Sequence, residues 1–534
     1  LVIKISSKFH QKFFKTILII EILFENIFIN YADPMKNKTN FKNTFLVMHK
    51  SCLTFFLSLI AINFTFAEES RALFEPMHVF DLEWAADPRV SPNGKTIVYV
   101  RKSNDIMKDR ERSNLWQISI DGSNHRPLYS GLKSIRSPRW SPSGEKLAYI
   151  SNDTGSQQIH VRWMDNGDTA VISQLKDSPS YLSWSPDGKW LAFTMDVKSE
   201  SETIAEPRDK PEGAKWAQEP ITVTTTRYQW DGQGIMEPAY SHIFIVPADG
   251  GSAKQLTHGD FNHFGSLAWT ADSQNIFFSA HRSENWELVS DEANIYSVNI
   301  TTKKLTQITN EVGAERSPSI SPNGKMIAYS FEERRPLAYT PDQIAIMDMN
   351  GNNKRIISKD LDGDADNIQW SDDNQSIFFS YDERGIRKIG QVMLNGEIEN
   401  VTNGLGGTSL GRPYLSGSYH HSAKNIAFTY GEAHRPADVA VIRNGEVKIL
   451  TQLNNDLLGH LKLGDINEII YKSSFDDQEI QGWYITPPNF DPKKKYPLIL
   501  EIHGGPHLAY GPYFSAELQI MAASGYVLFY NNYR

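Results

Sequence analysis

A short turn motif that recurs seven times constrains the fold of this chain more than any other feature. Its best-preserved form reads Ser-Pro-Asn/Asp-Gly-Lys, followed by alternating apolar residues that favour a β-strand. Successive copies begin 44 to 51 residues apart, except for one interval of 85 residues. A period of this length indicates a repeat architecture in which each copy is one supersecondary unit. The equivalent positions are Ser91, Ser141, Ser185, Thr270, Ser321, Ser371 and His420.

Each copy contains the residues of a turn between two strands. Proline fixes φ near the value that a turn requires, and glycine accepts a left-handed backbone. A second hairpin follows each turn, which gives four strands in roughly 50 residues, as in a propeller blade. We therefore predict a mainly β fold, a seven-bladed TolB/WD40-like β-propeller over residues 74–460 with no strand exchanged between the first and last blades. We expect four tryptophans that precede the turns to fill the space between neighbouring sheets: Trp140, Trp184, Trp269 and Trp370.

The long interval marks an insertion in the third blade, at residues 196–239. It is rich in Glu, Lys and Pro. Loops of this length inside a compact domain are usually functional or disordered. Two interpretations stay open, a segment that lines an access route and a solvated flap.

The N-terminal region has the pattern of an export signal. Residues 1–47 are crowded with Phe, Ile, Lys and Asn, and we interpret them as an upstream extension that is not native to the protein. Residues 48–67 combine a short basic region, an apolar run and a small-residue cleavage site, as in a secretory signal peptide. Met48 is the expected start, with Met35 as the alternative. We predict an exported, periplasmic or secreted protein without stable membrane insertion, and one that loses its single cysteine, Cys52, with the signal.

After Asp465 the repeat ends, and the sequence predicts a segment that mixes strands with a helix. Residues 468–488 predict a hairpin, and residues 514–524 predict a helix that ends at Gly525. A continuously apolar strand at 496–506 and a second one at 526–530 are typical of strands buried on both faces, in a sheet covered by helices.

The segment His503-Gly504-Gly505-Pro506-His507 resembles the oxyanion loop of the prolyl oligopeptidase (S9) family of serine peptidases. Residues 526–534 resemble the strand that leads to that family's Asn-Tyr-Arg-Gly-Ser segment, and the insertion is most similar to the acylaminoacyl-peptidase branch. The resemblance implies that residues 465–534 begin an α/β-hydrolase domain. It also implies hydrolysis of short peptides through an acyl-enzyme without a cofactor, an oxyanion donor in Gly504 and Gly505, and a loop-orienting role for His503.

No catalytic triad can be assigned within the chain. The resemblance places the family's Ser, Asp and His after Arg534, so we expect the sequence to be an incomplete hydrolase and inactive alone. One G-x-S-x-G match exists at 407–411, but Pro413 blocks the helix that a nucleophile elbow requires. Ser515 and Ser524 belong to the expected helix rather than to an elbow.

Three further patterns are weaker. Glu332 and Glu333 resemble the acidic pair with which aminopeptidase relatives bind a substrate N-terminus, although neighbouring residues on a strand point to opposite faces. The acidic stretch 360–366 lacks the spacing of a calcium loop, so an inter-blade turn is the better interpretation. His420 and His421 are adjacent without an acidic or cysteine partner, which favours blade packing, and we predict no metal site.

Composition separates the remaining function classes. The formal net charge of -9 argues against non-specific nucleic-acid binding, which requires a basic face. The expected partners are short peptide substrates. Two alternatives remain, a periplasmic TolB-like propeller that binds rather than cleaves, and a catalytically dead product of a truncated gene.

Overall fold

The computed structural model describes residues 71–533, apart from 132–133, 200–207, 218–220, 285, 290–291, 336, 338 and 506. The expected upstream extension and signal peptide lie outside the described residues. Residues 72–534 belong to one compact unit.

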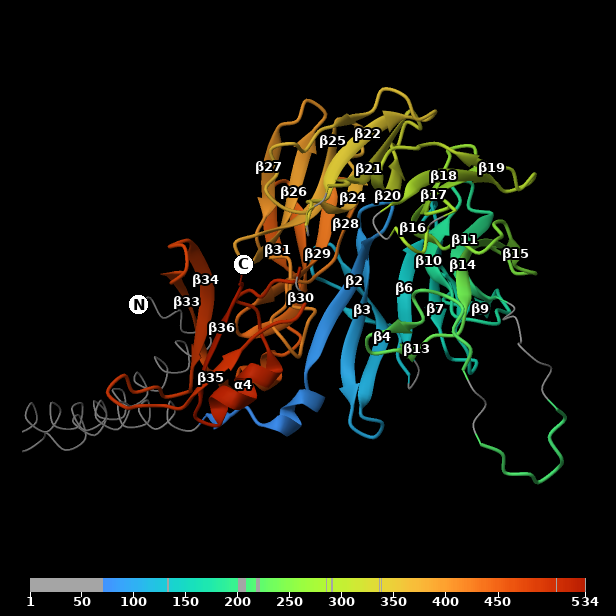
Figure 1. The fold of residues 1–534 in the computed structure, drawn as a ribbon. Coiled ribbons are helices and arrows are strands. Elements are labelled where there is room, and N and C mark those ends of the chain that lie inside the picture. Colours follow the sequence, from blue (N-terminus) through green and yellow to red (C-terminus); the bar gives the residue numbers. More distant parts are fainter. Residues whose placement is uncertain are drawn as a thin grey trace, which may run out of the picture. The chain divides into compact units, whose positions relative to one another are not determined.

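Seven four-stranded antiparallel sheets follow one another along the chain, each with its strands in sequence order (Figure 1). The first three contain β2 (Glu83–Val90), β3 (Thr96–Asp105), β4 (Arg110–Ser119) and β5 (Arg126–Tyr129); β6 (Ile135–Trp140), β7 (Lys146–Ser151), β8 (Gln158–Trp163) and β9 (Thr169–Val171); and β10 (Ser180–Trp184), β11 (Trp190–Lys198), β14 (Ala239–Pro247) and β15 (Lys254–Gln255). The fourth and fifth contain β16 (His263–Trp269), β17 (Asn275–Ala280), β18 (Asn294–Asn299) and β19 (Leu305–Gln307); and β20 (Gly313–Ile320), β21 (Met326–Glu333), β22 (Gln343–Asp348) and β23 (Arg355–Ile356). The sixth and seventh contain β24 (Asp366–Trp370), β25 (Ser376–Glu383), β26 (Ile386–Met393) and β27 (Ile398–Thr402); and β28 (Tyr419–Ser422), β29 (Asn425–Glu432), β30 (Arg435–Arg443) and β31 (Glu446–Ile449).

The repeated turn joins the first two strands of each sheet. In the first copy, the Gly94 N–H donates to the Ser91 carbonyl at 2.8 Å, and the Thr96 N–H donates to the Ser91 hydroxyl at 3.0 Å. Gly94 has φ +69°, a conformation that explains why glycine occupies this place. The serine of the motif is therefore structural, because its hydroxyl closes the turn.

The repeated tryptophans connect neighbouring sheets, as the sequence predicts. The indole N–H of Trp140, on β6, donates to the Arg89 carbonyl on β2 at 3.0 Å. Trp184 makes the same bond to Arg139 at 2.9 Å, and Trp370 makes it to Ser319 at 2.9 Å. Each of these three rings therefore ties the first strand of its sheet to that of the preceding sheet, whereas the buried Trp269 N–H has no hydrogen-bond partner among the described residues.

The seventh sheet packs against the first. One buried cluster contains Ala85 and Tyr99 from the first sheet together with Ala427 and Val439 from the seventh. All four strands of the seventh sheet come from residues 419–449, so it borrows no strand from the start of the chain.

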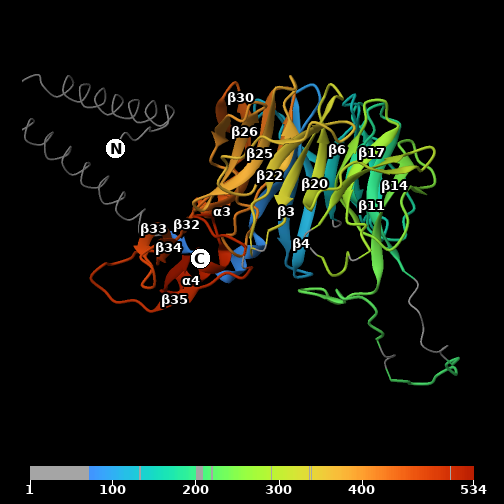
Figure 2. The ribbon, with the colours of Figure 1, turned by 45° about the horizontal axis from the view of Figure 1, so that its top comes forward.

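Short elements complete this region. The insertion begins after β11 and carries the small hairpin β12 (Gln229–Trp230) and β13 (Gly234–Ile235). Part of the insertion before this hairpin extends away from the sheets in both views (Figures 1 and 2), whereas Thr226 donates to Glu287 in the connection between β17 and β18. β1 (Ala72–Leu73) pairs in parallel with β32 (Leu461–Lys462), and η1 (Pro76–Phe80) and α3 (Asn455–Leu458) flank these strands. Among the described residues, no helix has the length and apolar character needed to cross a membrane.

The C-terminal residues form an eighth sheet with a different topology. Its order is β33 (Asp465–Lys472), β34 (Glu479–Thr486), β36 (Val527–Asn531) and β35 (Leu498–Glu501). β35 and β36 are parallel, and α4 (Ala516–Ala523) connects them. A core centred on Trp483 and Tyr530 lies between this helix and the sheet.

One expectation for this sheet is wrong. The apolar strand around residues 496–506 was expected to be buried on both faces, but β35 is an edge strand that pairs with β36 alone among the described residues. Leu498, Leu500 and Ile502 are 63%, 54% and 61% exposed. Apolar composition identifies a strand that suits a covered sheet, but it does not reveal which neighbours are present.

Candidate active site

Residues 502–509, which contain the predicted oxyanion loop and are called by that name below, leave the carboxyl end of β35. Gly505 has φ +140°, and a Cβ atom there would lie 2.7 Å from the His507 nitrogen and 2.9 Å from the Leu508 nitrogen. Only glycine fits this position without strain. Within the part of the chain that the structure describes, no hydrogen bond uses the N–H of Gly504 or Gly505. Both residues are exposed, so their backbones are accessible to a ligand.

His503 lies beneath the loop rather than on its surface. The residue is 4% exposed, and its ring stacks on Tyr533 with centroids 4.4 Å apart. The Tyr533 hydroxyl donates to the His503 carbonyl at 2.9 Å, and Nδ1 of His503 lies 2.8 Å from the Gly504 carbonyl. These contacts fix the direction in which the loop leaves the strand, a geometry that suits orientation of the loop.

A second charged side chain near this loop, that of Arg412, has no signal in the sequence. Arg412 comes from the loop between the sixth and seventh sheets, and its Nε and Nη2 donate to the Glu517 carboxylate at 2.7 and 3.1 Å. Its Nη1 also pairs with Glu501, which accepts a 3.1 Å hydrogen bond from the Tyr510 hydroxyl. No local pattern marks Arg412, because its partners are about a hundred residues away in the sequence.

The serines considered as nucleophiles have structural partners. The Ser409 hydroxyl donates to the Arg412 carbonyl at 2.7 Å, inside the Gly-rich loop that matches G-x-S-x-G. Ser515 caps α4, since its hydroxyl accepts from the Leu518 N–H at 3.2 Å and donates to the Gly411 carbonyl. The Ser524 hydroxyl donates to the Ile520 carbonyl at 2.9 Å.

Glu332 and Glu333 lie at the end of β21 with different partners. Glu332 pairs with Arg316 at 2.7 Å, whereas Glu333 pairs with Arg335. The two carboxylates therefore do not form one joint acidic pair. Binding of a substrate N-terminus by either residue stays a prediction.

The residues considered for metals have other roles in the structure. Asp364 accepts from the Asp342 N–H at 2.8 Å, and Asp366 pairs with Arg387. Nδ1 of His420 accepts from the Val90 N–H at 3.2 Å, which links the seventh sheet to the first. Among the described residues, no group of three or more His, Cys, Asp or Glu residues is placed to hold a metal ion.

A buried charge cluster surrounds His420. Burial opposes ionisation of Asp87, but Arg139 and Arg89 outweigh it and lower the pKa of Asp87 to about 2. Arg139 donates to the Asp87 carboxylate at 2.9 Å. Burial and the same two arginines hold the pKa of His420 well below its usual value. A neutral His420 is what its acceptor role requires.

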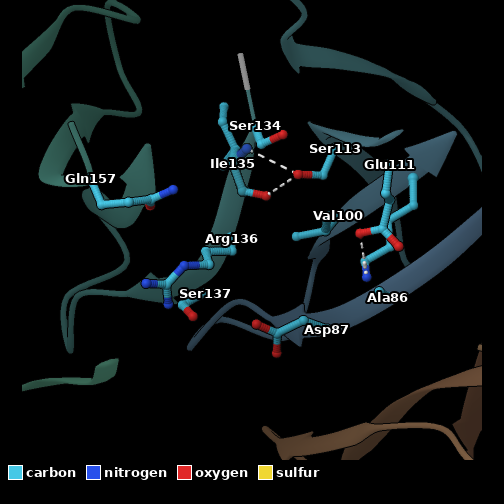
Figure 3. A pocket seen from close by; sticks show the side chains of 11 residues that line it. Ala86, Asp87, Val100, Glu111, Ser113, Ser134, Ile135, Arg136, Ser137 and Gln157 are labelled. Atoms are coloured by element: carbon cyan, nitrogen blue, oxygen red, sulfur yellow. Dashed lines mark hydrogen bonds and ion pairs between the residues drawn. The ribbon is translucent and has the colours of Figure 1, made fainter. Parts of the chain in front are cut away.

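A pocket of about 370 Å³ lies between the first and second sheets (Figure 3). Polar side chains line it together with Val100 and Ile135, and all lining residues belong to these two sheets and their connections. The Ser113 hydroxyl crosses the boundary and donates to the Ile135 carbonyl at 2.7 Å. The pocket is thus a feature of the repeat region and not of the oxyanion loop.

Comparison with known proteins agrees with this arrangement. Residues 96–340 match the family described as TolB beta propeller domain. The chain is 27% identical over 469 residues to the uncharacterized peptidase YuxL of Bacillus subtilis, covering 84% of this chain and 69% of that protein. It is 26% identical to dipeptidyl-peptidase 5 of Porphyromonas gingivalis, covering 84% of this chain and 66% of that enzyme.

The chain is thus similar in sequence to curated peptidases over most of its length. Its fold matches the Pyrococcus horikoshii acylaminoacyl peptidase with a TM-score of 0.69 at 18% identity, covering 86% of this chain and 67% of that structure. The chain spans about two thirds of the length of these relatives.

Proposed function

We propose that this chain supplies the propeller and the oxyanion donor of a serine peptidase that cleaves short peptides through an acyl-enzyme. The observation that carries the proposal is the Gly504–Gly505 turn at the end of β35, whose backbone is exposed and in which Gly505 has a glycine-only conformation. A fixed N–H that faces the developing oxyanion stabilises the transition state by several kcal/mol. A propeller that only binds ligands has no use for such a turn, so the peptidase function is favoured over the binding alternative.

The finer architecture belongs to the same proposal. We infer that the seven sheets close into a seven-bladed propeller, which limits the size of the peptides that reach the site. The contacts between the seventh and first sheets support this closure. We also infer that the eighth sheet is the start of an α/β-hydrolase domain, an inference supported by the parallel pair β35 and β36 with α4 between them.

We further propose that the nucleophile, base and orienting acid are not among residues 71–533. Ser409, Ser515 and Ser524 support this point, because each hydroxyl is engaged with the backbone. The 534-residue chain alone is then expected to be inactive, although its loop keeps the oxyanion donor.

Substrate class and location follow from the relatives and from the N-terminal pattern. The relatives named dipeptidyl-peptidase 5 favour release of dipeptides, with acylated amino acids as the alternative. Export after removal of residues 48–67 is the proposed localisation, and N-terminal sequencing of the exported protein should then begin at Glu68.

A fluorophosphonate serine probe tests the proposal. The 534-residue chain should remain unlabelled, whereas a longer product from the same locus that reaches the length of the relatives should be labelled. The longer product should also release chromophore from dipeptidyl or acetyl-aminoacyl p-nitroanilides. Labelling of Ser409 in the shorter chain would overturn the placement of the nucleophile. A longer product that neither labels nor cleaves would favour the binding propeller.

A further inference from the structure

One arginine of the propeller connects the two ends of the oxyanion loop. Glu501 is the last residue of β35, directly before the loop, and Glu517 is the second residue of α4, shortly after it. Arg412 binds both, with two hydrogen bonds to the Glu517 carboxylate and one to Glu501. A single guanidinium therefore spans the base of the loop.

The backbone around Arg412 runs antiparallel to the segment that follows the loop. The Ala516 N–H donates to the Leu410 carbonyl at 2.9 Å, and the Gly511 N–H donates to the Pro413 carbonyl at 3.0 Å. The Leu415 N–H donates to the Ala509 carbonyl at 3.1 Å. We call residues 410–415 the clamp segment. These bonds leave Arg412 little freedom to swing away from its two partners.

The chemistry of the contact demands an arginine. The Glu501 side chain is only 14% exposed, so an unpaired carboxylate there would be costly. A planar guanidinium can bind one carboxylate with two parallel bonds and still reach a second, which a lysine ammonium cannot do with the same directional control. The site thus uses both the charge and the fork shape of Arg412.

We propose that Arg412 is a positioning residue, which fixes the spacing of the two ends of the oxyanion loop and so holds the Gly505 N–H in its working direction. This role rests on the proposed function, because the loop matters only where an oxyanion forms. An oxyanion donor stabilises the transition state only if it is already oriented when charge develops. The propeller then helps to build the catalytic geometry as well as cover it.

Hydrogen exchange of the 534-residue chain, read by mass spectrometry, tests this role. Arg412→Ala should accelerate amide exchange across residues 510–516 by about tenfold or more, because the N–H groups of Tyr510, Gly511 and Ala516 there donate hydrogen bonds that hold the end of the loop. Arg412→Lys should restore part of the protection, since it keeps the charge but not the fork. Arg139→Ala is the matched control, as Arg139 is also partly buried and paired with an aspartate, but in the second sheet. The Arg139→Ala variant should show faster amide exchange only near the first two sheets.

Three results would overturn the proposal. They are unchanged exchange in residues 510–516, a change confined to the clamp segment, and equal effects of the alanine and lysine variants. If Arg412→Ala does not fold, Glu517→Gln removes one charge while keeping the side-chain shape and should produce a smaller acceleration at the same amides. Exchange does not require catalysis, so an inactive longer product would contradict the proposed function without changing this result.

Discussion

At the scale of single residues, two adjacent glycines of the oxyanion loop differ in whether they can accept a side chain. Gly505 adopts φ +140° and a Cβ would collide with two backbone nitrogens, whereas a Cβ on Gly504 would have no atom within 4 Å. Gly505→Ala should therefore lower the free energy of unfolding by about 1–3 kcal/mol, the usual cost of a strained backbone. Gly504→Ala should change it by less than about 0.5 kcal/mol. Urea unfolding of both variants measures the difference, and equal effects would contradict the glycine-only conformation.

Buried histidines predict an acid-sensitive region between the third and fourth sheets. Nδ1 of His263 donates to the Ser241 carbonyl, so its Nε2 accepts from Arg282 at 2.8 Å and the ring is neutral. Burial, together with nearby positive charge, lowers the pKa of His263 to about 3. Burial, His258 and Arg282 lower the pKa of His242 to about 4, with Asp260 opposing them.

The sign of the pH effect follows from these lowered values. Below about pH 6.5 these two histidines become protonated in the unfolded chain but stay neutral in the folded chain. Stability should therefore be full above that pH and fall as the pH drops toward 4, by up to about 1.4 kcal/mol per pH unit for each histidine. Arg282→Gln keeps a donor for His263 but removes the charge, and should flatten this loss between pH 6.5 and 5 in urea titrations. An unchanged slope would assign the acid sensitivity to other groups.

At the scale of elements, the indole N–H of a repeated tryptophan has a measurable role. Trp370 donates to the Ser319 carbonyl, whereas the Trp269 N–H is buried without a partner in the structure. The two rings are similarly buried, at 6% and 7% exposure. Trp370→Phe should thus destabilise the protein by about 1 kcal/mol more than Trp269→Phe, the value of one hydrogen bond. Chemical unfolding of the two variants measures this difference, and it should vanish if the rings act only by filling space.

The insertion should be the first site of proteolysis. Its described basic residues, Arg208, Lys210, Lys215 and Arg227, are exposed and lie outside the sheets. The repeated turns, in contrast, are closed by hydrogen bonds such as those of Ser91. Limited trypsin digestion should first cut between Lys198 and Arg227, and mass spectrometry of the earliest fragments would locate the cut. First cuts in the repeated turns would contradict this order.

Local chemistry explains which elements the sequence could predict. The repeated turns depend on proline, glycine and a serine only a few residues apart, so each copy carries its own signal. The Gly504–Gly505 turn is visible for the same reason. Arg412 is not, because its meaning comes from Glu501 and Glu517 on another sheet and helix. The prediction that β35 is buried on both faces was wrong, because an apolar strand looks alike at an edge and in the centre of a sheet.

At the scale of the whole molecule, the eighth sheet depends on the rest of the chain. Phe74 and Leu82 precede the first strand of the first sheet. They share a buried cluster with Phe514 and Ala516 of the helix region. The Tyr513 hydroxyl donates to the Leu405 carbonyl at 2.9 Å, between the sixth and seventh sheets. Residues 74–82, the connection between the sixth and seventh sheets, and the helix region of the C-terminal sheet therefore pack together.

The free edge of β35 predicts how the 534-residue chain behaves in solution. Leu498 and Leu500 alternate along this strand, Ile502 directly follows its end, and each of the three is more than half exposed. An apolar edge strand with unpaired backbone groups is a template for association with another chain. Leu500→Lys should reduce concentration-dependent aggregation without loss of stability, because a charge at an exposed edge opposes pairing.

Ile499→Lys is the matched control, since Ile499 packs against the core of the eighth sheet and its replacement should destabilise the protein. Light scattering at increasing concentration, combined with thermal unfolding, separates the two effects. Equal aggregation of the Leu500→Lys variant and the original chain would show that this edge is not the associating surface.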